Sequence, residues 1–359
     1  MRFGFFNSYT LWGGGEKWHF TAAEYMANMG HEVFVLCHPD GELFQRINAH
    51  PKMTAIEIII TKHSYWNPFF QLELHLKLRS LNLDTLVFNA PRDVRSAALT
   101  SRFAGIPRVI YRNGMPFPIP QKRSMIWAFQ KGLTQIVCIS KENRRVLEKE
   151  SPLLAKGHNI EIVTNAFDFT KVPEAKTDQD DPKEMTTLSN TGRLSEPKGQ
   201  YLLFQSCYLL KKTGYKIKLL MAGDGELEEE LKSLAASLDL KEEIEFLGFQ
   251  KDIYETLYRS DIFAFTSIWE GTASSILEAQ AIALPVVCFD ISSMPEMVAH
   301  EETGLLAKAK DAEDFAFQLE RLINSPDLRK SLGEAGRKNV KERFNVEDIY
   351  ARWEAILTN

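Results

Sequence analysis

Residues 267–278 read Ser267-Ile268-Trp269-Glu270-Gly271-Thr272-Ala273-Ser274-Ser275-Ile276-Leu277-Glu278. The apolar run just before them, residues 261–265, predicts a short buried strand. From Ser274 onward the composition is that of a helix, and Ser274 or Ser275 is placed to cap it. The stretch therefore predicts a strand, a tight loop and a helix N-terminus, whose free N–H groups and positive dipole end can hold a phosphate.

Two carboxylates flank this loop. Glu270 precedes it, and Glu278 follows about one turn into the helix, so both can face the position at the helix N-terminus where an anion would bind. A simpler interpretation also fits, because Ser275 and Glu278 have the spacing of a capping box, which could do no more than start the helix. The rest of the chain is needed to choose between the two.

The chain opens with a strand at residues 3–6, three glycines (Gly13, Gly14 and Gly15), a helix to about Met29 and a strand at residues 32–36. This βαβ order predicts an α/β fold with parallel sheets. The glycines do not match G-x-G-x-x-G, and no acidic residue ends the second strand, which disfavours a nicotinamide dinucleotide fold. They could approach a ligand or simply allow a tight turn with φ > 0. Further strands are predicted at residues 55–60, 84–88, 108–111, 135–139, 161–163, 187–190 and 216–221.

Composition excludes several classes of protein. A chain of 359 residues has room for two domains. Its net charge of −5 gives no polybasic character, so we expect no nucleic-acid partner. Its four cysteines lie far apart, which favours buried reduced thiols and a cytoplasmic protein. The N-terminus lacks the pattern of a signal peptide, and no apolar run approaches the ~18 residues of a spanning helix, so any membrane contact should be peripheral.

One segment departs from this charge balance. Residues 92–149 contain twelve basic and three acidic side chains. Within them, residues 117–129 mix basic, aromatic and apolar residues, a composition that suits an anionic membrane surface. We therefore expect residues 117–149 to offer such a surface, although a helix packed on the sheet with its lysines in water would look similar.

Several motifs together resemble family 4 of the retaining glycosyltransferases, over essentially the whole chain. Glu270 and Glu278 match its E-x7-E motif, and residues 191–199, Thr191-Gly192-Arg193-Leu194-Ser195-Glu196-Pro197-Lys198-Gly199, resemble its G-R-L-x-x-x-K-G. Residues 222–226 resemble its G-x-G turn beside the nucleotide, and residues 244–253, which include Gly248, resemble the element that meets the base. Two places depart from the family: Arg112-Asn113 stands near the usual His, and Ala283 and Ile291-Ser292-Ser293 stand where glycines are usual, so that the second loop should be less open.

The resemblance implies a GT-B fold, in which two Rossmann-like parallel-sheet domains face a cleft. The N-terminal acceptor-binding domain would span residues 1–170, a linker residues 171–185, and the C-terminal nucleotide-sugar domain residues 186–342. Residues 343–359 would form a helix that returns to the N-terminal domain; its apolar residues recur at helical spacing.

The resemblance also implies the activity: transfer of a sugar, with retention of anomeric configuration, from a nucleotide diphosphate sugar to a glycan or lipid-linked acceptor. The reaction would need no metal or other cofactor. It would serve in cell-surface polysaccharide or lipopolysaccharide synthesis. Arg193 and Lys198 would offset the charge of the diphosphate. Glu270 would hold the transferred sugar and Glu278 the ribose. The other donor-binding candidates are Gly14, Gly15, Gly223, Gly225, Gly248, Gly271, Thr272, Ala273 and Ser274. Arg112 and Asn113 are candidates for binding the acceptor, although Arg112 could equally be a surface arginine without a role.

Two other functions stay open at this point. A sugar-nucleotide epimerase of the same fold would need acid–base groups that converge on the sugar, which the E-x7-E pattern does not supply as such. A non-catalytic subunit that binds nucleotide sugars would be favoured if Arg193, Lys198 or Glu278 were missing, and all three are present.

Overall fold

The computed structural model describes residues 1–176 and 184–359, so the acidic part of the predicted linker, residues 178–181, lies outside the described residues. The chain forms two compact units. Unit 1 contains Met1–Asn165 together with Glu347–Asn359, and unit 2 contains Ala166–Val346. In the part of the chain that is described, no helix has the length and hydropathy of a membrane-spanning segment.

Unit 1 is built on a parallel sheet with the strand order β3-β2-β1-β4-β5-β6-β7. Its strands are β1 Arg2–Asn7, β2 Glu32–Cys37, β3 Met53–Glu57, β4 Thr85–Phe88, β5 Arg108–Asn113, β6 Gln135–Cys138 and β7 Asn159–Ile162. Phe5 of the central strand β1 lies opposite Val35 of β2 and Val87 of β4, and all three side chains are buried. Such near-continuous apolar strands are typical of a parallel sheet covered on both faces.

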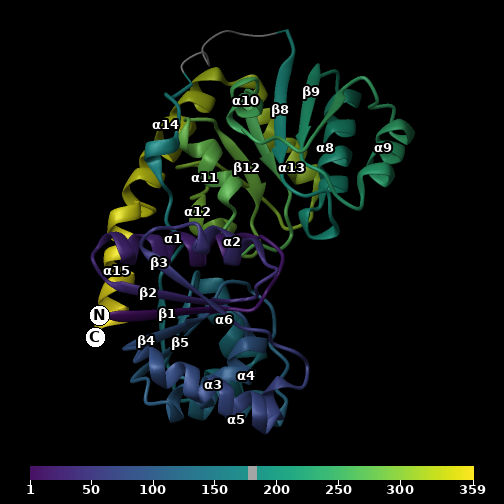
Figure 1. The fold of residues 1–359 in the computed structure, drawn as a ribbon. Coiled ribbons are helices and arrows are strands. Elements are labelled where there is room, and N and C mark those ends of the chain that lie inside the picture. The colour runs from purple at the N-terminus through teal and green to yellow at the C-terminus, as the bar shows by residue number, and fades with distance from the viewer. Residues whose placement is uncertain (177–183) are drawn as a thin grey trace. The chain divides into compact units, whose positions relative to one another are not determined.

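Helices cover both faces of this sheet, with α1 and α2 on one side and α3, α4 and α5 on the other (Figure 1). The helical elements of unit 1 are α1 Gly14–Asn28, α2 Glu42–Asn48, η1 Ser64–Trp66, α3 Pro68–Leu81, α4 Pro91–Phe103, α5 Arg123–Gly132, α6 Lys141–Glu150, α7 Pro152–Ala155 and α15 Val346–Thr358. As predicted, α1 ends just before Gly30, which adopts φ +89°.

The last helix, α15, belongs to unit 1. Trp353 is buried there with its ring centroid 4.8 Å from that of Trp18, and Tyr350 stacks on Tyr25 at 4.8 Å. The hydroxyl of Thr85 on β4 donates to the carbonyl oxygen of Leu357 at 2.7 Å. The apolar face that the sequence predicted for this helix is therefore covered by α1 and the sheet of the first unit.

Unit 2 repeats the plan with a parallel sheet of order β10-β9-β8-β11-β12-β13. Its strands are β8 Thr186–Thr191, β9 Ile217–Ala222, β10 Ile244–Gly248, β11 Ile262–Phe265, β12 Val286–Phe289 and β13 Leu305–Ala307. Its helical elements are η2 Phe169–Lys171, η3 Glu196–Lys198, α8 Gln200–Lys212, α9 Glu228–Ser237, α10 Tyr254–Tyr258, α11 Ser274–Ala281, α12 Met294–Met297, α13 Ala312–Asn324 and α14 Pro326–Arg343. The prediction of two parallel α/β sheets with a C-terminal helix is confirmed.

Some predicted boundaries shift. The strand predicted at residues 55–60 is β3, Met53–Glu57, because its pairing with β2 ends where Cys37 lies opposite Glu57. Ile58 and Ile60, which suggested strand, are buried beyond the end of the pairing. The strand predicted at residues 161–163 is β7, Asn159–Ile162. The four cysteines are buried thiols, as expected.

Candidate functional site

The predicted donor residues of unit 2 gather in the loops that follow neighbouring strands. Because β9, β8 and β11 are adjacent and parallel, their carboxyl ends share one edge of the sheet, where ligands bind in open α/β folds. Arg193 and Lys198 follow β8, Gly223 and Gly225 follow β9, and Glu270 follows β11. The structure thus places residues from distant parts of the sequence at one edge.

Glycines allow the first two of these loops to touch. Gly223 has φ +146°, and a Cβ built on it would lie 2.0 Å from the carbonyl oxygen of Gly192. A Cβ on Gly225 would lie 2.2 Å from the carbonyl oxygen of Leu194, whose N–H donates to Asp224 at 2.7 Å. The N–H of Gly223 also donates to Gly248 at 2.8 Å. These glycines are therefore required for the close packing of three strand-end loops, whatever they bind.

The loops after β8 and β11 are joined in the same way. A Cβ on Gly199, which has φ +61°, would lie 2.5 Å from the carbonyl oxygen of Thr266. The N–H of Ile268 donates to Pro197 at 2.8 Å, and the Thr266 hydroxyl donates to the carbonyl oxygen of Lys198 at 3.2 Å. This packing fixes the backbone on both sides of Lys198.

Lys198 and Glu270 form an ion pair across these two loops. The lysine side chain is 25% exposed and that of Glu270 12% exposed, so the pair is partly shielded from water. The ammonium also lies 5.6 Å from the centroid of the Phe265 ring. A cation and a carboxylate fixed side by side can attract a phosphate and accept hydroxyl hydrogen bonds at neighbouring points.

Helix α11 begins beside this pair but is not capped as predicted. Ala273 is the N-cap, with extended backbone, and no side chain caps the helix in the described structure. Ser274 and Ser275 are the first two helical residues, and Glu278 stands too far along the helix for a capping box. The predicted serine cap and the capping-box alternative are both wrong, because the loop from Gly271 brings the chain into the helix one residue earlier. The first N–H groups of α11 remain available to an anion.

The remaining donor candidates have different surroundings. Arg193 is 75% exposed, and its Nε lies 3.7 Å from a carboxylate oxygen of Glu226, a loose ion pair at the surface. Gly271 and Ala273 are buried, whereas Thr272 is half-buried and Ser274 exposed. Glu278 lies near Tyr254, whose pKa is raised by burial and by the charge of Glu278.

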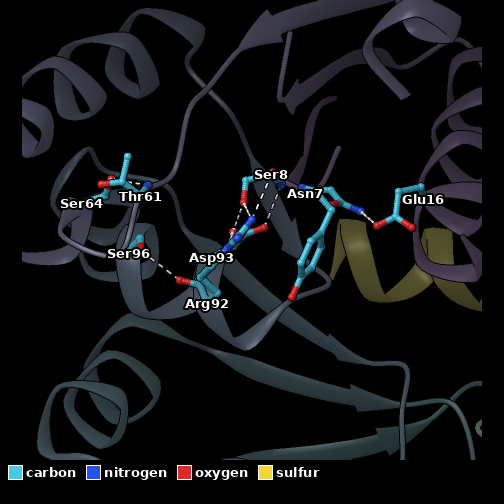
Figure 2. Close-up of polar contacts among 9 residues, drawn as sticks. Asn7, Ser8, Glu16, Thr61, Ser64, Arg92, Asp93 and Ser96 are labelled. Atoms are coloured by element: carbon cyan, nitrogen blue, oxygen red, sulfur yellow. Dashed lines mark hydrogen bonds and ion pairs between the residues drawn. The ribbon is translucent and has the colours of Figure 1, made fainter. Parts of the chain in front are cut away.

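The glycine-rich loop of unit 1 is the start of α1, with Gly13 as N-cap at φ −146°. None of its three glycines has a positive φ, so the turn that was the alternative explanation is wrong. A Cβ on Gly15 would lie 2.3 Å from Asn89, while Gly14 has no atom within 4 Å of that position. The Glu16 carboxylate accepts from the N–H of Gly13 at 3.0 Å. It also accepts from the side-chain amide of Asn7 at 2.9 Å (Figure 2).

Arg112 is buried, so the surface-arginine alternative is wrong. Its guanidinium donates to Asn89 at 2.6 Å and to Asn165 at 2.7 Å, and it stacks 4.2 Å from the centroid of the Trp18 ring. Burial lowers the pKa of Arg112 to about 9, which still leaves it charged at neutral pH. Asn113 is buried too, and its carbonyl oxygen accepts from Asn143 at 3.1 Å.

Sequence reasoning missed a second polar cluster in unit 1 (Figure 2). The buried carboxylate of Asp93 accepts from the N–H of Ser8 at 2.9 Å and from its hydroxyl at 2.5 Å. Arg92 donates to the same serine, at 2.6 Å to its hydroxyl and 3.1 Å to its carbonyl oxygen. Burial raises the pKa of Asp93 to about 6. The available signal was position, because Arg92 and Asp93 follow the strand predicted at residues 84–88, and ligands bind beyond the carboxyl ends of strands in open α/β sheets.

Sequence reasoning also missed Ser292 and Ser293, whose hydroxyls contact the backbone of Glu270. Their only signal was that serines stand where the family usually has glycines. As to metals, no group of three or more His, Cys, Asp or Glu side chains that could hold an ion occurs within residues 1–176 and 184–359.

Comparison with known proteins identifies the family. Residues 12–173 match the model of Glycosyltransferase Family 4, and residues 172–339 match that of Glycosyl transferases group 1. An uncharacterised glycosyltransferase of Methanocaldococcus jannaschii is 27% identical over 266 residues, and the match covers 64% of each chain. An Escherichia coli UDP-Gal:alpha-D-GlcNAc-diphosphoundecaprenol alpha-1,3-galactosyltransferase is 23% identical over 342 residues, which cover 90% of this chain and 88% of that enzyme.

The fold has close counterparts among solved structures. The Anabaena protein HepE, solved in complex with UDP, superimposes with a TM-score of 0.85 over 100% of both chains, at 17% identity. The two family models meet at the boundary between the two sheets and together span nearly the whole chain. The chain therefore belongs to family 4 of the glycosyltransferases and is a retaining glycosyltransferase with the GT-B fold that uses a nucleotide sugar as donor.

Proposed function

We propose that this enzyme transfers a sugar from a nucleotide diphosphate sugar to a glycan or lipid-linked acceptor, during synthesis of a cell-surface polysaccharide or lipopolysaccharide. The observation that supports donor binding is the Lys198–Glu270 ion pair beside the uncapped start of α11. It puts a cation, a carboxylate and free backbone N–H groups at one strand-end edge, which is what binding of a phosphorylated sugar needs.

The donor would be held by groups from three loops. Lys198 and Arg193 would offset the negative charge that develops on the departing diphosphate, together with the N–H groups of Gly271, Thr272 and Ala273. In this proposal Glu270 accepts hydrogen bonds from the transferred sugar, and Glu278 from the ribose. The first N–H groups of α11, at Ser274, would face the phosphates. Gly223, Gly225 and Gly248 would act by letting the loop backbones approach the nucleotide.

The proposed reaction needs no enzymic nucleophile. Front-face attack by the acceptor hydroxyl forms the new glycosidic bond as the bond to the diphosphate breaks. The leaving phosphate oxygen then takes the acceptor proton. Because Lys198 and Arg193 supply positive charge at the diphosphate, we propose that the reaction proceeds without a metal ion, so that EDTA should leave turnover unchanged.

We place the acceptor at the strand ends of unit 1. Arg112 and Asn113 end β5 there, at the carboxyl edge of the parallel sheet. Arg112 keeps a positive charge there, which favours an acceptor that carries phosphate. The E. coli relative acts on a diphosphoundecaprenol-linked sugar, which is an acceptor of this kind.

A lipid-linked acceptor requires access to a membrane surface, and α5 offers one. It buries Met125 and Phe129, while Trp127 is 57% exposed. Lys122, Arg123 and Lys131 are exposed as well. An exposed aromatic among cations suits anionic headgroups, so we propose that the enzyme works at the inner face of the cell membrane.

Helix α3 carries an exposed apolar stripe of its own. Phe69, Leu72 and Leu76 recur at helical spacing and are 84%, 58% and 59% exposed. The helix packs against α4, which also packs against α5. Such a stripe on a helix at the surface supports contact with lipid.

The test is a panel of five donors: UDP-glucose, UDP-galactose, UDP-N-acetylglucosamine, UDP-N-acetylgalactosamine and GDP-mannose. Each is incubated with the enzyme and with a lipid-linked sugar acceptor, and release of nucleotide and transfer of sugar are both measured. The proposal expects acceptor-dependent release with one donor, unchanged by EDTA. Interconversion of two donors without transfer would instead indicate an epimerase, and binding without release a non-catalytic subunit.

A further inference from the structure

The backbone of Glu270 is held by two serines from the loop between β12 and α12. The N–H of Glu270 donates to the Ser292 hydroxyl at 3.2 Å, and that hydroxyl donates back to the Glu270 carbonyl oxygen at 2.9 Å. The hydroxyl of Ser293 donates to the same carbonyl oxygen at 2.8 Å. Both backbone polar groups of Glu270 are therefore bonded to side chains of a different loop.

Ser292 holds this position at a conformational cost. Its φ is +58°, in the left-handed region that glycine adopts readily and L-residues with a Cβ disfavour. Glycine would satisfy the backbone at this place but would have no hydroxyl to offer. The serine side chain gains its two hydrogen bonds to Glu270 in exchange, and Ser293, which is almost fully buried, adds the third.

The side chain of Glu270 is fixed as well, through Lys198. The carbonyl oxygen of Lys198 in turn accepts from the hydroxyl of Thr266, just after β11. The carboxylate of Glu270 is thus held from its backbone by the β12–α12 loop and from its tip by the β8 loop. The Glu270 carboxylate therefore has little freedom to move toward a sugar whose hydroxyls are placed differently.

We infer that Ser292 and Ser293 are positioning residues that fix the Glu270 carboxylate against the transferred sugar and so set how strictly the enzyme discriminates among donor sugars. This inference rests on the proposed role of Glu270 as the sugar ligand. It predicts that the serines act on the sugar part of the donor and leave the binding of the nucleoside diphosphate unchanged.

The test is the double variant Ser292→Gly, Ser293→Ala, with calorimetric titration of the panel donor that turns over fastest and of its free nucleoside diphosphate. Loss of these hydrogen bonds should weaken binding of the nucleotide sugar about 3- to 10-fold, while affinity for the diphosphate stays the same. The ratio of kcat/KM between the preferred donor and its poorer C4 epimer should fall by a similar factor.

The matched control is Ala283→Gly. Ala283 also has a positive φ, +63°, but lies just beyond the C-terminal end of α11, whereas Glu270 precedes its start. This control should keep wild-type affinity and donor ratio. Unchanged sugar affinity in the double variant would overturn the inference, as would an equal loss of affinity for both ligands. Glu270→Gln is titrated in parallel: if it too leaves sugar affinity unchanged, the proposed role of Glu270 fails instead.

Discussion

At the scale of single residues, the two cations proposed for the diphosphate differ in how firmly the fold holds them. Lys198 is ion-paired and partly shielded, whereas Arg193 is 75% exposed. We expect Lys198→Ala and Arg193→Ala each to lower kcat by roughly 10²-fold or more, as for removal of a preorganised charge partner. Steady-state kinetics with the panel donor measures this.

The control for these two variants is Lys212→Ala, which removes an exposed lysine at the end of α8. It should keep wild-type turnover, and all three proteins should melt within a few degrees of the wild type. Near-normal kcat in both the Lys198 and the Arg193 variant would remove the diphosphate assignment.

Glu278 gives a second test at this scale, because α11 shows that it is not a capping residue. A ribose ligand should accept two hydroxyl protons with its carboxylate, whereas an amide accepts at one oxygen only. A hydrogen bond to a charged acceptor contributes about 1.5–3 kcal/mol, so Glu278→Gln should raise the Kd of the nucleoside diphosphate by roughly one to two decades. Titration of both proteins decides, and an unchanged Kd would remove Glu278 from the proposed donor site.

How far single residues could be predicted depended on what determines their position. The motifs of Lys198 and Glu270 were predicted to bind one donor, and the structure places them after neighbouring strands, where they form an ion pair. The serine cap of α11 was wrong because the loop, not the side chain, decides where the helix begins. The contacts of Ser292 and Ser293 could not be predicted, since a serine at a positive φ follows from no local preference.

At the scale of elements, α5 should bring the enzyme to anionic membranes. Replacing Lys122, Arg123 and Lys131 by Ser should weaken binding to vesicles that contain phosphatidylglycerol, by about 1 kcal/mol for each charge near the surface. Co-sedimentation with anionic and with neutral vesicles measures the difference.

The matched control removes the same charge elsewhere, from three exposed lysines of unit 2, namely Lys212, Lys308 and Lys338. If electrostatics at α5 matter, this triple variant should sediment like the wild type. Equal sedimentation of wild type and α5 variant with both kinds of vesicle would rule the surface out.

Elements were predictable where periodicity was strong and less so at their ends. The alternation of strand and helix gave both sheets, because parallel strands are apolar over their whole length. The end of β3 was misplaced since Ile58 and Ile60 are buried without being paired as strand. The apolar stripe of α3 was not identified at all, although its spacing is regular.

At the scale of the whole molecule, the stability of unit 1 should depend on pH through His19. This side chain is fully buried on α1, and burial, with the nearby charge of Arg112, lowers its pKa to about 3. An unfolded histidine titrates near 6.5, so the unfolded state binds the extra proton first. His19 therefore stabilises the fold above about pH 6.5, and this contribution is lost progressively as the pH falls toward 3.

Urea denaturation at about pH 7.5 and about pH 5 measures the effect. The wild type should lose about 2 kcal/mol of unfolding free energy through His19 over this range, and His19→Leu should not. Asp93, whose pKa is raised to about 6, changes stability with pH in the opposite direction. Because wild type and His19→Leu both contain Asp93, the difference between these two proteins isolates the contribution of His19. Replacing the exposed His63 by Leu controls for loss of an imidazole. If the unfolding free energy changes equally between the two pH values in His19→Leu and in the wild type, the prediction is contradicted.

The overall organisation was predictable only in part from the residues. The spacing of Ile349, Tyr350 and Trp353 shows that α15 buries one face, but it does not say against what. That the helix returns to the first unit came from the resemblance to the family, since no local signal encodes a contact between the two ends of a chain.

The place of α15 in unit 1 has a consequence for how the chain is made. Unit 2 is one continuous stretch, but unit 1 also contains residues that are synthesised only after unit 2. While Ala166–Val346 is being synthesised, the rings of Trp18 and Tyr25 lack the partners that cover them in the finished protein. The apolar strip of unit 1 that α15 covers therefore stays exposed until α15 itself has left the exit tunnel.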